Sequence, residues 1–172
     1  MIHISRYRSP LGTLVMGATE DRLVLCDWLT RRDSTSFISR IATNLRATVT
    51  DGYTPVIAMA EKQLDEYFSG RRKIFDLPLL LTGTPFQESV WHAIAAIPYG
   101  ETATYSDIAD TIGHPEAVRA VANATGANRL SIILPCHRII GRNDPGGYAG
   151  GADIKRGLQL LESHYNGRGS AE

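Results

Sequence analysis

The sequence predicts an α+β protein built from two parts, and three observations support this prediction. Residues 2–8, 12–18 and 22–28 alternate polar and apolar side chains, as half-buried antiparallel strands do. Helical spacing dominates the rest of the chain. The 172 residues suffice for one domain or two small ones, and 43% apolar with 21% charged residues excludes a disordered chain.

The first half is expected to form a small antiparallel sheet with helices. Turn-forming residues at Ser9-Pro10-Leu11-Gly12 and Glu20-Asp21 separate the three strands. Helical spacing over Ser34–Leu45 and Val56–Phe68 predicts two helices, which could cover one face of the sheet.

A domain boundary is predicted near Gly83. An apolar run at residues 77–81 indicates a buried extended segment, and the glycine that follows it is typical of a chain break. We therefore expect domains 1–82 and 83–172, the first structural and the second carrying the chemistry.

The second domain begins with a run of helices. Thr84-Pro85-Phe86-Gln87 is a capping box with proline at the first helical position, so a helix is predicted from here to Ile97. Thr104–Ile112 and Glu116–Thr125 are predicted as two more helices, joined by a tight corner at Gly113-His114-Pro115. This outline is that of a helix-turn-helix, which also occurs in proteins that never bind nucleic acid.

Charge and side-chain size favour a local DNA contact on the third helix. Lysine plus arginine and aspartate plus glutamate both total 18, so no overall charge attracts nucleic acid. Residues 117–143, however, contain four arginines and no acidic residue. Ala117, Ala120 and Asn123 are small enough to let the helix backbone approach a narrow groove, although tight helix packing is the alternative.

The composition also bears on location. The longest apolar runs are far shorter than the roughly 18 residues of a membrane span, and the N-terminus lacks a signal-peptide pattern. Only two cysteines argue against a disulfide framework, so a cytoplasmic location without membrane contact is expected. Of these, Cys26 falls on the predicted core face of the third strand, as a small hydrophobic residue would.

The second cysteine, Cys136, lies at a structural break. A predicted buried strand, Ile132–Leu134, ends at Pro135, and His137 follows the thiol. A cysteine reacts as thiolate, which a nearby imidazolium or arginine favours. Adjacent strand residues point to opposite faces, so His137 can activate Cys136 only if the chain turns there or a water bridges them. Metal ligation is disfavoured, because adjacent residues fit one tetrahedral ion poorly.

A closing helix over residues 152–163 brings a carboxylate toward the core. Ile154 and Glu162 share one face of this helix. A buried carboxylate needs a partner, and a histidine would complete a Cys, His, Glu relay. Equally, Glu162 could lie at the edge of the face and reach solvent or Arg156. Residues 166–172 are predicted to be a frayed tail.

The residues between the thiol and this helix are dense in turn formers. Such a loop, from Arg142 to Gly151, can fold over a flat ligand. Its one aromatic side chain, Tyr148, has a hydroxyl suited to orienting a polar group, and a plain loop anchor is the alternative.

These motifs carry a resemblance to a known family. Pro135-Cys136-His137-Arg138, preceded by Asn128 and followed by Gly147-Tyr148-Ala149-Gly150-Gly151, resembles the signature of the O6-alkylguanine-DNA alkyltransferases. Further matches are Gly83-Thr84-Pro85-Phe86-Gln87, Val90-Trp91, Ile97-Pro98-Tyr99-Gly100-Glu101-Thr102 and Arg119-Ala120-Val121. The resemblance is to the bacterial stand-alone form. It implies a ribonuclease H-like N-terminal domain and a winged helix-turn-helix-like C-terminal domain with an active-site loop.

The resemblance implies a role for each matching residue. Cys136 would accept the alkyl group from guanine O6, with His137 acting through a water as its base and Glu162 orienting His137. Asn128 would support the active-site turn, and Tyr105 would rotate the phosphate and help protonate the leaving guanine. Arg119 would enter the duplex in place of the extruded base. The other implied DNA contacts are Ala117, Ala120, Asn123 and Tyr105. The residues implied around the flipped base are Tyr148, Ala149, Ile139 and Cys136.

The implied activity is direct-reversal DNA repair, in which the alkyl group moves irreversibly to Cys136 in a single turnover. O4-alkylthymine is a further implied substrate. No cofactor and no metal are expected. The expected partner is alkylated double-stranded DNA, with no obligate protein partner and with cooperative self-association on DNA as an option. The chain departs from the family at Arg129, where proline is usual, in a short loop before Tyr148, and at Gly157 in the closing helix.

Two other functions remain as alternatives. A noncatalytic alkyltransferase-like protein would bind the damaged base without reacting, but such proteins replace the cysteine that is present here as Cys136. A cysteine hydrolase using Cys136, His137 and Glu162 would turn over many times and would not need a helix-turn-helix.

Overall fold

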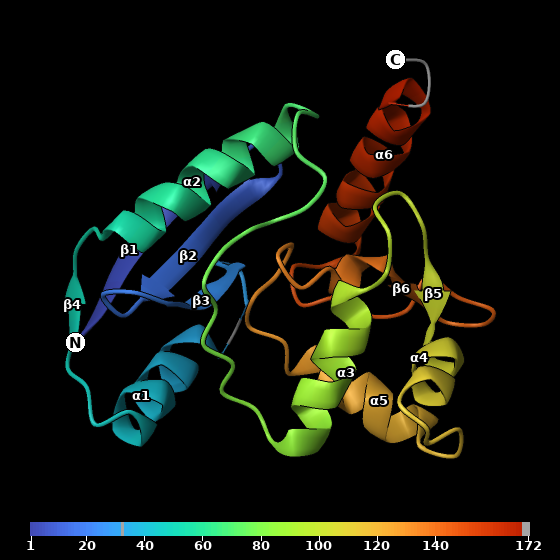
Figure 1. The fold of residues 1–172 in the computed structure, drawn as a ribbon, viewed down its shortest axis with the longest axis horizontal. Coiled ribbons are helices and arrows are strands. Elements are labelled where there is room, and N and C mark those ends of the chain that lie inside the picture. Colours follow the sequence, from blue (N-terminus) through green and yellow to red (C-terminus); the bar gives the residue numbers. More distant parts are fainter. Residues whose placement is uncertain (32, 170–172) are drawn as a thin grey trace. The chain divides into compact units, whose positions relative to one another are not determined.

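The computed structural model describes residues 1–31 and 33–169 and divides into two compact units, Met1–Thr82 and Gly83–Glu172 (Figure 1). Within these residues, the first unit contains a sheet and two helices, and the second is mainly helical. The α+β class predicted from the sequence is therefore confirmed. Within the described residues, no helix has the length and apolar character needed to cross a membrane.

The sheet of the first unit has four strands in the order β3-β2-β1-β4. β1 (Ile2–Ser9), β2 (Gly12–Ala18) and β3 (Leu23–Trp28) form the predicted antiparallel meander. β4 (Val49–Asp51) pairs in parallel with β1, so the sheet is mixed and not purely antiparallel as expected. A strand of three residues is too short to show the alternation by which strands are predicted.

The two helices of this unit pack on opposite faces of the sheet. α1 (Ser34–Asn44) packs on an apolar cluster that includes Ile2 of β1. On α2 (Pro55–Phe68), Asp65 accepts a hydrogen bond of 2.6 Å from the Tyr7 hydroxyl, also from β1. Side chains at even and odd positions of a strand point to opposite faces of the sheet, so Ile2 and Tyr7 face opposite sides. Figure 1 likewise shows the strands between the two helices. The expectation that both helices cover one face is therefore wrong.

Two smaller predictions for this unit have different outcomes. Cys26 is fully buried, and burial raises the pKa of its thiol, which agrees with a structural role. The segment 77–81 is extended as predicted, because Leu79 bridges Leu23 and the Leu23 N–H donates to the Pro78 carbonyl at 2.8 Å. It is half-buried instead of buried, since it adds to the outer edge of β3.

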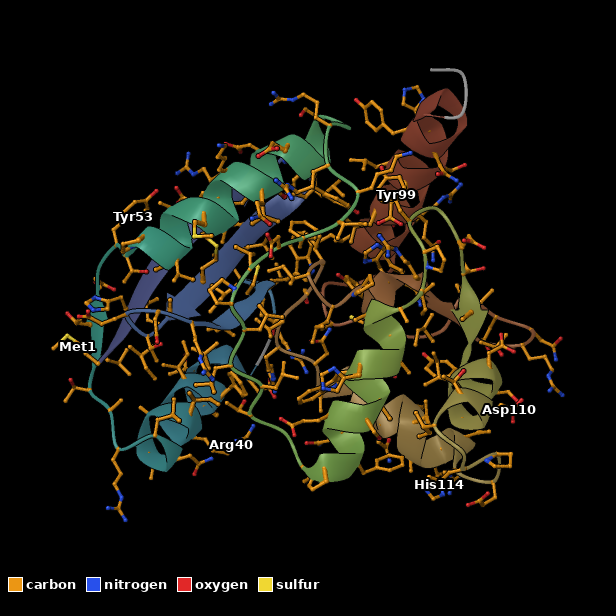
Figure 2. All side chains as sticks on the ribbon, viewed as in Figure 1. Met1, Arg40, Tyr53, Tyr99, Asp110 and His114 are labelled. Atoms are coloured by element: carbon orange, nitrogen blue, oxygen red, sulfur yellow. The ribbon has the colours of Figure 1, made fainter. Side chains whose placement is uncertain are left out.

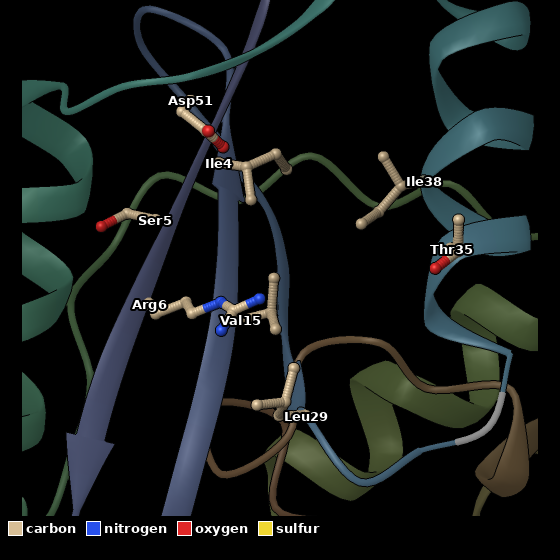
Figure 3. A pocket seen from close by; sticks show the side chains of 8 residues that line it. All are labelled: Ile4, Ser5, Arg6, Val15, Leu29, Thr35, Ile38 and Asp51. Atoms are coloured by element: carbon tan, nitrogen blue, oxygen red, sulfur yellow. The ribbon is translucent and has the colours of Figure 1, made fainter.

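Figure 3 shows a hollow in the first unit, at the sheet face next to α1. Its lining residues are Ile4, Ser5, Arg6, Val15, Leu29, Thr35, Ile38 and Asp51. The walls combine apolar side chains with one basic and one acidic group, Arg6 and Asp51. None of the residues predicted for the reactive site belongs to this lining.

The second unit contains the predicted three helices. α3 (Pro85–Ala95), α4 (Tyr105–Thr111) and α5 (Val118–Gly126) pack against one another as a helix-turn-helix. The capping box before α3 is present: the Gln87 N–H donates to the Thr84 hydroxyl at 3.2 Å, and the Thr84 N–H donates to the Gln87 amide oxygen at 3.0 Å. Local capping chemistry thus sets the start of this helix.

The closing helix α6 (Ala152–Gly169) is longer than predicted. It continues through Asn166, so the first part of the predicted frayed tail is helical, and residues 170–172 lie outside the described residues. The added turns of the helix pass close to Gly100. The φ of Gly100 is +79°, and a Cβ there would lie only 2.6 Å from the Asn166 amide nitrogen. The absence of a side chain at Gly100 gives the last turns of α6 a surface to pack against.

Candidate active site

Cys136, the predicted alkyl acceptor, follows a turn that the sequence did not predict. Residues 132–134, expected as a buried strand, form turns, and Ile132 has a φ of +71°. Positive φ is an outlier for a β-branched side chain and costs about 1–3 kcal/mol, so the surrounding contacts must hold it. An apolar run looks the same in a buried strand and in a buried turn, which is why periodicity misled the prediction.

Asn128 holds this turn together. Its amide nitrogen donates to the Leu134 carbonyl at 2.9 Å, and its amide oxygen accepts from the Leu130 N–H at 2.8 Å. The same amide nitrogen lies 3.2 Å from the Cys136 sulfur and donates to it. Asn128 is 2% exposed, so these contacts are shielded from water. The Asn128 side chain therefore connects the turn to the Cys136 sulfur. The sequence analysis expected Asn128 to support this turn.

The chain turns again at the cysteine. Pro135 precedes a short 3-10 helix, Cys136–Arg138, which supplies the turn that activation of Cys136 by His137 requires. Cys136 is 6% exposed, and His137 is fully buried. Among the described residues, the Nδ1 atom of His137 has no hydrogen-bond partner. This nitrogen is therefore available to a water or a substrate.

Glu162 faces inward and binds His137. It is buried, and its Oε2 lies 2.6 Å from the His137 Nε2. Its Oε1 accepts a hydrogen bond of 3.2 Å from the Gly100 N–H. Of the two alternatives from periodicity, the buried pair describes Glu162, and the solvent-facing contact with Arg156 does not. A carboxylate only accepts hydrogen bonds, so Nε2 carries the proton and Nδ1 of the neutral ring has the lone pair.

The electrostatics of the pair favour an ionised carboxylate and a neutral imidazole. Burial opposes ionisation of Glu162, but the hydrogen bonds from His137 and Arg138 and the positive charge of Arg138 outweigh it and lower the pKa of Glu162 to about 2. Burial lowers the pKa of His137. Glu162 counteracts this in part, while the positive charges of Arg138 and Lys155 lower that pKa further. His137 is thus suited to act as a base at neutral pH.

A small parallel sheet joins the helix-turn-helix to this turn. β5 (Ala103–Thr104) pairs with β6 (Ile139–Ile140), which directly follows the 3-10 helix, and both are visible in Figure 1. Tyr105 begins α4 immediately after β5. The topology therefore brings Tyr105 next to the reactive segment, although 31 positions separate it from Cys136.

A lysine that the sequence analysis did not single out holds the loop between β6 and α6. The Lys155 ammonium donates to the Pro145 carbonyl at 2.5 Å and to the Gly147 carbonyl at 3.2 Å. Lys155 is 2% exposed, and burial lowers its pKa. Lys155, Leu158 and Glu162 are spaced i, i+3 and i+7, which puts them on one face of a helix. This spacing could have predicted that Lys155 points inward.

The loop that Lys155 holds borders Tyr105. Gly146 has a φ of +72°, and a Cβ there would lie 2.8 Å from the Tyr105 hydroxyl. Burial raises the pKa of Tyr105, and a hydrogen bond from the Gly147 backbone opposes this rise. Tyr148 and Ala149 follow in the loop and are half-buried. The predicted base-binding residues thus follow a segment whose conformation requires glycine.

The predicted DNA-contacting residues lie mostly on the exposed side of α5. Arg119, Ala120 and Asn123 are exposed, and Ala117, the residue before the helix, is half-buried. The opposite side is buried, where the Ala124 carbonyl accepts a hydrogen bond of 2.8 Å from an indole of α3. Tight helix packing, the alternative reason for small residues, therefore does not explain Ala120 or Asn123.

The arginine-rich stretch contributes less positive surface than its composition indicates. Of its four arginines, Arg129 and Arg138 are buried, and Arg119 and Arg142 are exposed. A count along the sequence cannot separate surface cations from buried ones. Arg138 in particular forms an ion pair with Glu162.

Both halves of the chain match domains of a known protein family. Residues 2–81 match "6-O-methylguanine DNA methyltransferase, ribonuclease-like domain", and residues 85–164 match "6-O-methylguanine DNA methyltransferase, DNA binding domain". The constitutive methylated-DNA-protein-cysteine methyltransferase of Bacillus subtilis (strain 168) is 42% identical over 164 residues, which are 94% of this chain and 96% of that protein.

Solved structures agree with these matches. The crystal structure of Mycobacterium tuberculosis O6-methylguanine methyltransferase has a TM-score of 0.82 at 39% identity, covering 96% of this chain and 94% of that one. The structure of Mycobacterium tuberculosis OGT in complex with DNA has a TM-score of 0.81 at 39% identity, covering 95% and 94%. The chain belongs to the O6-methylguanine DNA methyltransferase family.

Proposed function

We propose that this protein repairs DNA directly, by moving the alkyl group of O6-alkylguanine to its own Cys136. The observation that carries the proposal is the buried array in which Asn128 contacts the sulfur at 3.2 Å and Glu162 orients His137 at 2.6 Å. Membership of the methyltransferase family supports the same reaction. The methyl group is the alkyl group expected to be transferred, and O4-alkylthymine is a second candidate substrate.

The reaction needs a thiolate and a bound leaving group. The Cys136 proton passes through a water to Nδ1 of His137, which Glu162 keeps in the accepting tautomer. The sulfur attacks the alkyl carbon, the carbon–oxygen bond breaks, and the electron pair stays on guanine, with Tyr105 helping to supply the proton that neutralises it. The product is a thioether. Water does not cleave a thioether readily, so each molecule reacts once.

Access to the O6 atom requires the base to leave the duplex, which costs a few kcal/mol. Arg119, exposed on α5, would take the place of the extruded base, with Ala120, Asn123 and Ala117 at the minor groove. A separate set of residues would surround the flipped base: Tyr148, Ala149, Ile139 and the backbone of Cys136. The partner is thus alkylated double-stranded DNA, and self-association on DNA stays a prediction.

The two units would have different functions. Domain 1–82 would be structural, and domain 83–172 would bind DNA and accept the alkyl group. A cytoplasmic location fits this chemistry, because a reducing compartment keeps Cys136 as the thiol that the reaction consumes.

The test is to incubate the protein with a duplex bearing one O6-methylguanine and to measure its intact mass and its tryptic peptides. We expect a gain of one methylene on the Cys136 peptide, saturating at one per chain. Cys136→Ser should gain nothing, and Cys26→Ser, the matched control at a buried structural thiol, should react normally. An unchanged mass with tight lesion-selective binding would support the noncatalytic damage-binding protein instead. Repeated turnover would support the hydrolase.

A further inference from the structure

We infer that Arg138 is a positioning residue for alkyl transfer, because its guanidinium fixes the carboxylate that holds His137 in its proton-accepting tautomer. The inference rests on the proposed function and adds a fourth residue to the Cys136, His137 and Glu162 array. Arg138 acts through Glu162 and does not touch the reacting atoms.

The guanidinium binds both oxygens of one carboxylate. The Arg138 Nε donates to Oε1 of Glu162 at 2.8 Å, and a terminal nitrogen donates to Oε2 at 3.2 Å. This Oε2 is the atom that also accepts from the His137 Nε2 at 2.6 Å. The planar fork of an arginine matches a carboxylate in two places at once, so it fixes the rotation of the Glu162 carboxylate. The direction of the His137 hydrogen bond is fixed with it.

The guanidinium is itself held in place. Its second terminal nitrogen donates to the Ile97 carbonyl at 2.6 Å, and its central carbon lies 5.6 Å from the centre of the Tyr99 ring. Tyr99 is labelled in Figure 2, where it lies beside α6. Arg138 is 6% exposed, so water does not compete for these contacts. These contacts hold the long, flexible side chain of Arg138 in one conformation.

Within the described part of the chain, three charged groups face His137. Glu162 and Lys155 approach from α6, and Arg138 follows His137 in the chain. Glu162 raises the pKa of His137, whereas Arg138 and Lys155 lower it. Without the charge of Arg138, the pKa of His137 rises, so the imidazole becomes protonated at a higher pH. A protonated imidazole cannot accept the thiol proton, so the loss of Arg138 changes the pH dependence of the reaction.

The first test measures the rate constant of alkyl transfer from an O6-methylguanine duplex as a function of pH. Arg138→Met should lower the rate about tenfold to a hundredfold, because the base is misaligned, and should move the acidic limb of the profile to higher pH. Arg156→Met, a matched control at an exposed arginine of α6, should change neither. A loss by the same factor at every pH would overturn the inference.

A double-variant experiment guards against misfolding. Arg138→Met leaves Glu162 buried without its cation, whereas Arg138→Met combined with Glu162→Gln removes both charges together. If Arg138 positions His137 through Glu162, it should matter little once the carboxylate is gone, and at a pH above the acidic limb the double variant should react within about twofold of Glu162→Gln alone. An equally large effect of Arg138→Met in both backgrounds would show that it acts independently, and the inference would fail.

The closing experiment needs no alkyl transfer. Nitrogen-15 NMR of the imidazoles in the unreacted protein reports the tautomer and the titration of His137 directly. We expect the Nε2-protonated tautomer in the wild-type protein and titration at higher pH in Arg138→Met. An unchanged signal in the variant would refute the role of Arg138 even if the protein repairs DNA. Absence of alkyl transfer in the wild-type protein would refute only the proposed function.

Discussion

At the scale of single residues, the site depends on charges that are buried together. Glu162 is 2% exposed, yet it stays ionised because the imidazole of His137, the guanidinium of Arg138 and the Gly100 N–H all donate to it. An isolated buried carboxylate would instead become protonated. The ionised form matters for function, because only an acceptor carboxylate forces the proton of His137 onto Nε2.

This ionisation should be visible in the pH dependence of stability. The pKa of Glu162 is about 2 in the folded protein against an ordinary value of 4.5, so its contribution is present above pH 4.5 and is lost as pH falls toward 2. Glu162→Gln should abolish this part of the acid destabilisation and, by leaving Arg138 unpaired, cost about 3 kcal/mol at neutral pH. Urea unfolding between pH 2 and 7 measures both effects. Parallel pH curves for variant and wild type would contradict the prediction.

Asn128 makes a second prediction at this scale. Asn128→Ala removes the partners of the Leu130 N–H and the Leu134 carbonyl, so the free energy of unfolding should fall by about 1–3 kcal/mol. Alkyl transfer should slow as well, because the turn that carries the sulfur loses its support. Urea unfolding and single-turnover kinetics measure these effects. Asn44→Ala, at an exposed position of α1, is the matched control, and equal losses in both variants would argue against the specific role.

At the scale of elements, the site is assembled from short segments held by their ends. The 3-10 helix presents Cys136, the pairing of β5 with β6 brings in Tyr105, and one face of α6 supplies Lys155 and Glu162. The 3-10 helix and the two strands, of two or three residues each, are too short to keep their conformation alone. The hydrogen bonds and pairings between them therefore determine the geometry of the site.

Lys155 should control the order of the loop between β6 and α6. Lys155→Met removes the donors to Pro145 and Gly147, so trypsin should cleave after Arg142, in the exposed part of this loop, several times faster than in the wild type. Timed digestion followed by mass spectrometry measures the rate. Lys62→Met, at an exposed lysine of α2, should leave the cleavage rate unchanged. Equal rates in Lys155→Met and wild type would show that the loop is held by other contacts.

At the scale of the whole molecule, charge limits how strongly the protein holds undamaged DNA. Positive and negative side chains are equal in number, 18 each, and two arginines of the basic stretch are buried. Nonspecific DNA binding depends on cations that neutralise phosphates. A repair protein of this composition should therefore rely on the flipped base more than on the backbone.

The salt dependence of duplex binding tests this conclusion. Arg119 and Arg142 are the exposed arginines of residues 117–143. A plot of the logarithm of the affinity against the logarithm of the salt concentration should therefore have a slope no steeper than about −3. Arg119→Ala should make the slope shallower by about 1. Fluorescence anisotropy with an undamaged duplex measures the slope. A slope near −6 would reveal a basic surface elsewhere on the molecule.

Local patterns in the sequence determined much of the architecture. The strand meander, the capping box at Thr84 and the helical spacing of α6 depend on near neighbours in the chain, so they could be predicted. The same spacing placed Glu162 on an inward face, and the motif around Cys136 indicated the family.

The tertiary structure alone decided the rest. The turn at residues 132–134, the parallel pairing of β4, the burial of Arg129 and the shared carboxylate of Glu162 all depend on segments distant in sequence. A single window of sequence contains no information on which distant groups will surround a side chain. Whether an arginine such as Arg138 meets DNA or a buried carboxylate is therefore settled by packing and desolvation, which act only once the chain has folded.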